Sequence, residues 1–170
     1  MTSRWFWLSG CGNPSFPAGQ IPDIFRSMPQ LHPPLSGMPL AFVSLLLVLE
    51  LCSRVPAVAR VLPAARALLL PALVLSCVAT FLSGYQASSS MGEISEAAEA
   101  ALGIHHAIGR FVLINSLLLA IFAWLARIAR QATAIFWALY YVALAMQVGL
   151  TIWAGSIGGV LVFSHRIGVG

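Results

Sequence analysis

The sequence contains no lysine, and charged residues occupy only 8% of its 170 positions. So small a charged fraction, combined with 59% apolar residues and a mean hydropathy of +0.90, excludes an ordinary soluble domain. The isoelectric point near 9.5 comes mainly from arginines beside the apolar segments. We therefore expect a membrane protein with no nucleic-acid partner.

Cysteine is scarce as well, and its spacing excludes several classes of site. Cys11, Cys52 and Cys77 fall in segments that cannot easily meet, so no disulfide framework is expected. The chain has no CxxCH for covalent c-type haem and no CxxC pair for zinc or an iron–sulfur cluster. LSGC at residues 8–11 resembles a lipoprotein cleavage box, but the apolar run before it is too short for a signal peptide. No nucleophile–base pair, phosphate loop or carboxylate dyad indicates an independent hydrolase or transferase.

Apolar residues fall into four blocks, near 39–55, 67–85, 107–126 and 132–163. A helix needs roughly 20 residues to cross about 30 Å of hydrocarbon, and the blocks lack the alternation of barrel strands. The predicted fold is therefore all-α, an integral membrane four-helix bundle. We expect the first helix to end near Arg54, and the long fourth helix to tilt or to project at its C-terminal end.

Residues 1–33 are rich in proline, glycine and serine and show no helical period, which predicts an irregular N-terminal arm. Residues 34–170 form the predicted four-helix domain. We expect the arm to bind other membrane protein subunits, because so small a bundle has little extramembrane surface to order it. A separate short helix is predicted to start near Met91, with Ser90 and Glu93 as its capping box.

Arginine predicts the orientation, because positive residues near membrane ends are retained in the cytoplasm. Arg54, Arg60 and Arg66 fall between the first two predicted helices, and Arg127 and Arg130 fall between the last two. Both connections should be cytoplasmic. We therefore predict a multi-pass protein of the bacterial inner membrane, with its N- and C-termini on the periplasmic side.

The four histidines, His32, His105, His106 and His165, should all lie at the outer face, although they come from three separate stretches. Imidazole is a common haem and metal ligand, and two histidines opposed across a helical bundle can hold a b-type haem. We prefer His105 as the inward ligand of the third helix. Two alternatives stay open: a transition-metal site on His105, His106 and His165, or simple interfacial histidines.

Small residues near these histidines are compatible with a porphyrin between helices, although they also suit plain helix packing. Gly109 shares a face with His105, and Gly158 and Gly159 precede the closing histidine. Arg110, on the face of His106, can pair with a haem propionate or reach the lipid headgroups.

Three other polar residues within the spans have structural interpretations. Glu50 is expected to pair with Arg54 at i+4, and Asn115 and Gln147 to form hydrogen bonds across helices.

Three motifs carry a resemblance: LHPPLSGMPLAF at 31–42, HHAIGR at 105–110 and GGVLVFSHRIGVG at 158–170. Together they resemble a bacterial four-helix membrane domain of unknown function (number 2231), over residues 31–170. The resemblance implies an HP pair before the first helix, a histidine opening the third helix, and a closing histidine. Here these are His32 with Pro33, His105 or His106, and His165. Members of this family look like partners of redox proteins.

Two departures from the family matter. Gly37 stands where many members have a second histidine, and Arg166 stands where glycine is usual. The first departure reduces the number of ligands and weakens a model with two haems.

The leading hypothesis is an integral membrane subunit of an electron-transfer complex. It binds b-type haem near the outer face through His32, His105 or His106, and His165. Electrons would pass between membrane quinol and an outer redox protein. The alternative is a cofactor-free accessory subunit that stabilises a larger membrane complex. Either role is expected ahead of an independent enzyme.

Overall fold

The computed structural model describes residues 32–89, 91–129 and 131–165 of the chain. The predicted arm lies outside this part, except for its last two residues. His32 and Pro33 belong to the first described helix, so the helical domain begins slightly earlier than the boundary predicted at residue 34.

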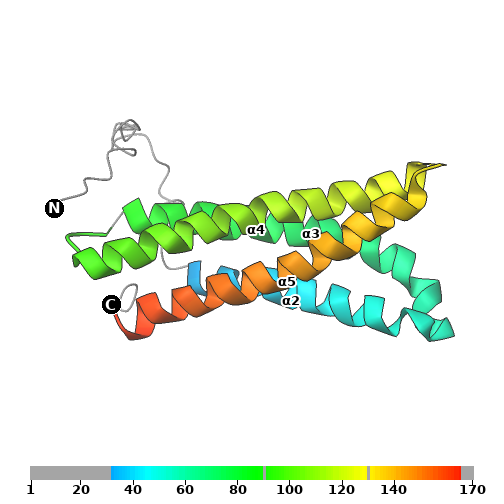
Figure 1. Ribbon diagram of the computed structural model, residues 1–170. Coiled ribbons are helices and arrows are strands. Elements are labelled where there is room, and N and C mark those ends of the chain that lie inside the picture. The colour runs from blue at the N-terminus through cyan, green and yellow to red at the C-terminus, as the bar shows by residue number, and fades with distance from the viewer. Residues whose placement is uncertain (1–31, 90, 130, 166–170) are drawn as a thin grey trace, which may run out of the picture.

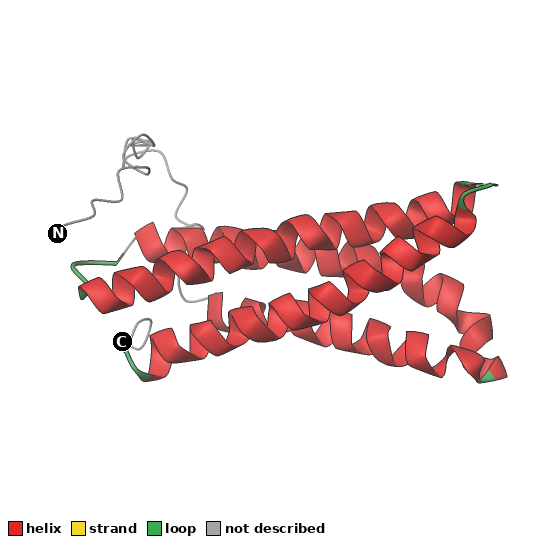
Figure 2. Ribbon diagram, viewed as in Figure 1, coloured by secondary structure: helices red, strands yellow, loops and turns green. Residues whose placement is uncertain are grey.

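Four long helices make up the described structure. They are α2 (His32–Leu51), α3 (Pro56–Ser89), α4 (Glu96–Ile128) and α5 (Thr133–Phe163), with a short 3₁₀ segment, η2 (Cys52–Arg54), between the first two. They run up and down in a bundle, and no strand occurs in the described ranges (Figures 1 and 2). Each is long and apolar enough to cross a membrane, which confirms the predicted all-α four-helix fold of a multi-pass membrane protein.

Two helices begin at points different from those predicted. Helix α3 begins at Pro56, so the arginine-bearing segment expected to be a loop is helical. Proline suits the first turn of a helix, where its missing N–H has no intrahelical role. Helix α4 begins at Glu96 and includes most of the predicted short helix, and Ser95 caps it by accepting a 3.3 Å hydrogen bond from the Ala98 amide.

The core is apolar and tightly closed. Helix α4 packs most extensively against α5, and α2 packs against α3. Helices α2 and α4 make no close backbone contact and lie diagonally across the bundle. One layer of fully or almost fully buried leucines lies near the middle of the core and comprises Leu46, Leu73, Leu119 and Leu144. Large apolar side chains also cover the outside of the bundle, as expected for a surface in contact with lipid.

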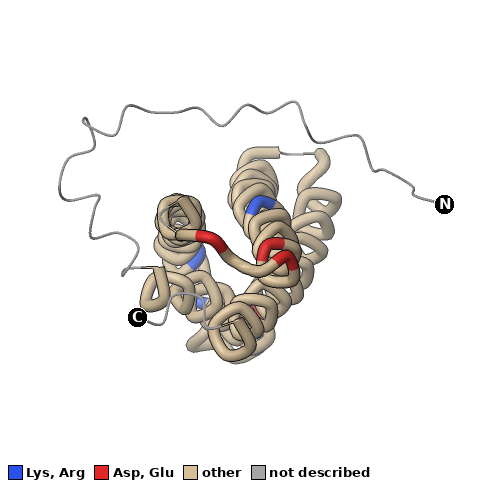
Figure 3. Tube along the Cα trace, turned by 90° about the vertical axis from the view of Figure 1, so that its left-hand side faces the viewer, with Lys and Arg blue, Asp and Glu red and all other residues tan. Residues whose placement is uncertain are grey.

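The two ends of the bundle differ in charge. At the histidine end, α2 and α4 begin and α3 and α5 end; at the arginine end lie the α2–α3 and α4–α5 connections (Figure 1). The view from the histidine end shows acidic residues gathered around the α3–α4 connection, where Glu93, Glu96 and Glu99 lie (Figure 3). The expected asymmetry is present, and the side of the membrane that each end faces stays a prediction.

Candidate functional site

His32, the first residue of α2, is held by the end of α3. Its Nδ1 lies 3.1 Å from the carbonyl oxygen of Thr80 and 3.1 Å from Oγ of Ser83. A carbonyl can only accept, so the hydrogen-bond network places the proton of His32 on Nδ1. This tautomer leaves the lone pair of Nε2 free. Metal-binding histidines commonly donate their other nitrogen to a carbonyl in this way.

His105 of α4 reaches toward His32 from the diagonal position in the bundle. The two ring centroids are 6.3 Å apart and the rings are perpendicular. Nδ1 of His105 is buried and has no hydrogen-bond partner among the residues described. The carbonyl of Ala154 on α5 is close enough for an electrostatic contact, but the geometry is not that of a hydrogen bond. A buried polar atom without a partner costs about 1–3 kcal/mol, and such an atom often marks a place where something binds.

Two glycines make room for these imidazoles. A Cβ at Gly84 would lie 2.7 Å from Cε1 of His32, and a Cβ at Gly158 would lie 3.3 Å from Cε1 of His105. Of the three glycines that the sequence suggested beside a porphyrin, only Gly158 faces a histidine ring, and that ring fills its space. By contrast, a Cβ at Gly109 would make only an ordinary 3.8 Å contact with Phe81, and one at Gly159 would meet only its own helix. Gly84 was not singled out in the sequence, because only its contact with a residue far along the chain reveals its role.

His106 follows His105 but points elsewhere, because successive residues of a helix are turned by about 100°. The two rings are 6.5 Å apart. His106 lines a groove of about 180 Å³ together with Phe81, Tyr85 and Arg110. Arg110 is exposed and forms no ion pair within the described part of the chain. His106 and Arg110 therefore share a site on the side of the bundle, between α3 and α4.

His165 lies apart from the other three histidines. It is half-buried in the turn that follows α5, with its amide 3.4 Å from the Val160 carbonyl, and it has no ring contact with His32, His105 or His106. In the described ranges, no three histidine, cysteine or acidic side chains are arranged to hold a metal ion. The metal site on His105, His106 and His165 stays a prediction.

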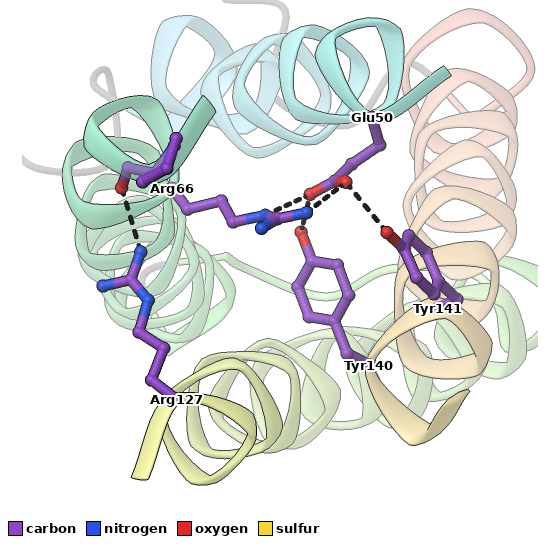
Figure 4. A network of polar contacts seen from close by, with 6 residues as sticks. Glu50, Arg66, Arg127, Tyr140 and Tyr141 are labelled. Carbon is purple, nitrogen blue, oxygen red and sulfur yellow. Dashed lines mark hydrogen bonds and ion pairs between the residues drawn. The ribbon is translucent and has the colours of Figure 1, made fainter. Parts of the chain in front are cut away.

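A second buried polar cluster lies near the arginine end, and it corrects the pairing expected for Glu50. Arg66 of α3 binds the Glu50 carboxylate through Nε and Nη2, both at 2.6 Å, whereas Arg54 lies exposed in η2 (Figure 4). The hydroxyls of Tyr140 and Tyr141 on α5 donate to the same carboxylate at 2.6 and 3.3 Å. The i+4 rule failed here because burial of a carboxylate requires several partners, which only other helices supply.

These four donors fill the acceptor positions of the Glu50 carboxylate. The Arg66 guanidinium also lies 4.4 Å from the centre of the Trp137 ring, a cation–π contact. The cluster therefore joins α2, α3 and α5 and leaves the carboxylate no free position for a ligand. Its role is structural.

The expected bond across the third and fourth helices is confirmed. Nδ2 of Asn115 donates to Oε1 of Gln147 at 2.8 Å and to the carbonyl of Ala143 at 2.9 Å. Both side chains are buried, so this pair links α4 to α5 within the core.

Comparison with protein-family models, with curated proteins and with solved structures finds no match to this chain. The resemblance drawn from the three sequence motifs stays a prediction.

Proposed function

We propose that this protein is an integral membrane subunit of an electron-transfer complex and binds b-type haem at the histidine end through His32 and His105. The observation that carries the proposal is the opposition of these two imidazoles across the bundle, from diagonal helices α2 and α4. In helical bundles, cofactors commonly take their ligands from facing helices. A bound haem supplies one-electron redox chemistry.

The distance between the rings would allow His32 and His105 to hold one iron between them. Two metal–nitrogen bonds of roughly 2 Å plus the two ring radii give on the order of 6 Å between ring centres. The measured separation is 6.3 Å. Ordinary perpendicular packing of aromatic rings spans the same range, so the stronger support is the fixed tautomer of His32, which leaves its Nε2 able to bind iron.

The space around the rings sets a condition on binding. The groove beside His106 measures about 180 Å³, below the roughly 300–1,000 Å³ of typical cofactor pockets, and the two imidazoles occupy the hollows at Gly84 and Gly158. A haem therefore requires the ends of α3 and α5 to move apart around the two rings, while His32 and His105 keep their spacing. Both α3 and α5 end at this end of the bundle, so the movement can stay local.

The remaining features of the proposal follow from the sequence. The histidine end would face the periplasm of a bacterial inner membrane, membrane quinol would supply electrons, and an outer redox protein would receive them. His165 and Arg110 would lie at the rim, where Arg110 can pair with a propionate. Residues 1–31 would bind neighbouring subunits.

A reduced-minus-oxidised absorption spectrum of the purified protein, with its co-purifying subunits, tests the proposal. We expect b-type bands that disappear in His32→Ala and His105→Ala and persist in the matched variants His106→Ala and His165→Ala. Far-UV circular dichroism would establish that each variant is folded. A spectrum without b-type bands from the folded protein would refute the haem proposal.

A cofactor-free accessory subunit is the second candidate, and one observation favours it. The imidazoles already fill the hollows beside Gly84 and Gly158, so the bundle closes without a cofactor. This role predicts a flat spectrum together with stable co-purification of other membrane subunits. It also predicts that His105→Ala leaves that assembly intact.

A further inference from the structure

The groove at His106 continues along the outside of α4. Its upper part, nearest the histidine end, is lined by Phe81, Tyr85, His106 and Arg110. A second hollow of about 400 Å³ is lined by Ala107, Arg110, Phe111 and Ile114. Arg110 lines both, so the two hollows are neighbours: the first is polar and aromatic, and the second, on the outside of α4, is apolar.

The polar groups of the groove are free to bind a ligand. Within the part of the chain that the structure describes, the Tyr85 hydroxyl, the His106 ring and the Arg110 guanidinium have no hydrogen-bond partner. Tyr85 is 54% exposed and Phe111 is 61% exposed, on the surface that faces lipid. A ligand would therefore enter from the membrane, and not through the closed core.

The groove suits a ligand with a planar polar ring and an apolar tail. Phe81 and Tyr85 provide aromatic faces, against which a flat ring can stack. Arg110 and Tyr85 can donate hydrogen bonds to ring oxygens, and His106 can donate or accept according to its tautomer. From His106 to Ile114 the helix rises about 12 Å, so an attached tail would lie along apolar side chains toward the membrane centre.

We propose that this groove binds the headgroup of a membrane quinone or quinol between α3 and α4. The proposal rests on the proposed function, for which it supplies the site of the electron donor. The His106 ring is 6.5 Å from the His105 ring, so the bound headgroup lies beside the His32–His105 pair. The phosphate of an anionic phospholipid can accept from the same donors, but it has no flat ring to stack on Phe81 and Tyr85, so the aromatic wall favours a quinone.

Photoaffinity labelling of the full-length protein in nanodiscs, with a short-tailed azidoquinone as the probe, tests the site. We expect label on peptides that contain residues 81–85 and 106–114, and loss of that label with excess decylubiquinone but not with phosphatidylglycerol. Arg110→Gln should weaken the apparent affinity roughly tenfold, the size expected for one charge-assisted hydrogen bond. Tyr85→Phe should weaken it less, since a neutral donor is lost. Arg60→Gln, which changes an exposed arginine of α3 toward the other end, should have no effect.

Label spread evenly over lipid-facing peptides, or equal affinity in Arg110→Gln and the unchanged protein, would overturn the proposal. Competition by phosphatidylglycerol as strong as that by decylubiquinone would overturn it in favour of an anionic lipid. The absorption spectrum separates the two proposals. Haem bands without specific labelling would support the haem proposal and refute the quinone site. Specific labelling of a protein without haem bands would support the quinone site and refute the haem proposal.

Discussion

Replacement of Arg66 by methionine should be among the most destabilising single changes in this bundle. The Glu50 side chain is only 2% exposed, and Arg66 supplies two of the four hydrogen bonds that its carboxylate accepts. Loss of one partner from a buried ion pair costs about 3–5 kcal/mol, because the other charge remains buried. The bonds from Tyr140 and Tyr141 persist and offset part of this, at about 0.5–1.5 kcal/mol each. We expect a net loss of about 1–3 kcal/mol in the free energy of unfolding.

The double variant Glu50→Leu with Arg66→Met provides the sharper comparison. Replacement of a whole buried ion pair by apolar residues is often neutral or stabilising, so the double variant should be more stable than Arg66→Met alone. Unfolding by sodium dodecyl sulfate in mixed micelles, followed by far-UV circular dichroism, measures both values. Arg60→Met is the matched control at an exposed position and should change stability by less than about 0.5 kcal/mol. Two results would refute the structural role of the cluster. One is a loss of less than about 1 kcal/mol in the free energy of unfolding for Arg66→Met, and the other is a double variant that is less stable than Arg66→Met.

Other substitutions test the histidine end and the core. Gly84→Ala places a Cβ against the His32 ring, so it should lower the free energy of unfolding by about 1–3 kcal/mol in the same assay and weaken any haem bands. Gly37→Ala is the control and should be tolerated, because a Cβ there meets nothing within 4 Å. Equal stability of the two variants would show that His32 does not occupy the hollow at Gly84. Gln147→Leu removes the bond from Asn115 and should cost about 0.6–1.7 kcal/mol, and a value near zero would mean that another acceptor replaces the amide.

The number of helices and their order could be predicted because an apolar run of membrane length carries its own signal. Helix starts were harder to predict. Pro56, Pro63 and Arg60 between them suggest a loop by composition, yet proline is acceptable in a first turn and the segment is helical in the structure. The cap was predicted at Ser90, which lies outside the described residues, whereas Ser95 caps α4 in the structure.

The candidate site was predictable in place but not in detail. Topology alone brings the histidines to one end of the bundle, whereas the choice of partners depends on side-chain direction. His105 faces His32, His106 faces the outer groove, and His165 stands apart. The Glu50 cluster was missed because its partners lie 16 and 90 residues along the chain, beyond any local spacing rule.

The leucine layer has a consequence for the direction of proton movement. On α2, α3 and α5, its member lies between the histidine end and the residues of the Glu50 cluster, and all four side chains are at most 2% exposed. Such a layer acts as an insulator, because neither water nor a proton crosses packed hydrocarbon cheaply. Protons taken up or released beside the histidines would therefore exchange with the aqueous phase at that end alone. The redox chemistry proposed for that end should respond to the pH of one compartment and be indifferent to the other, which proteoliposomes with unequal internal and external pH can measure.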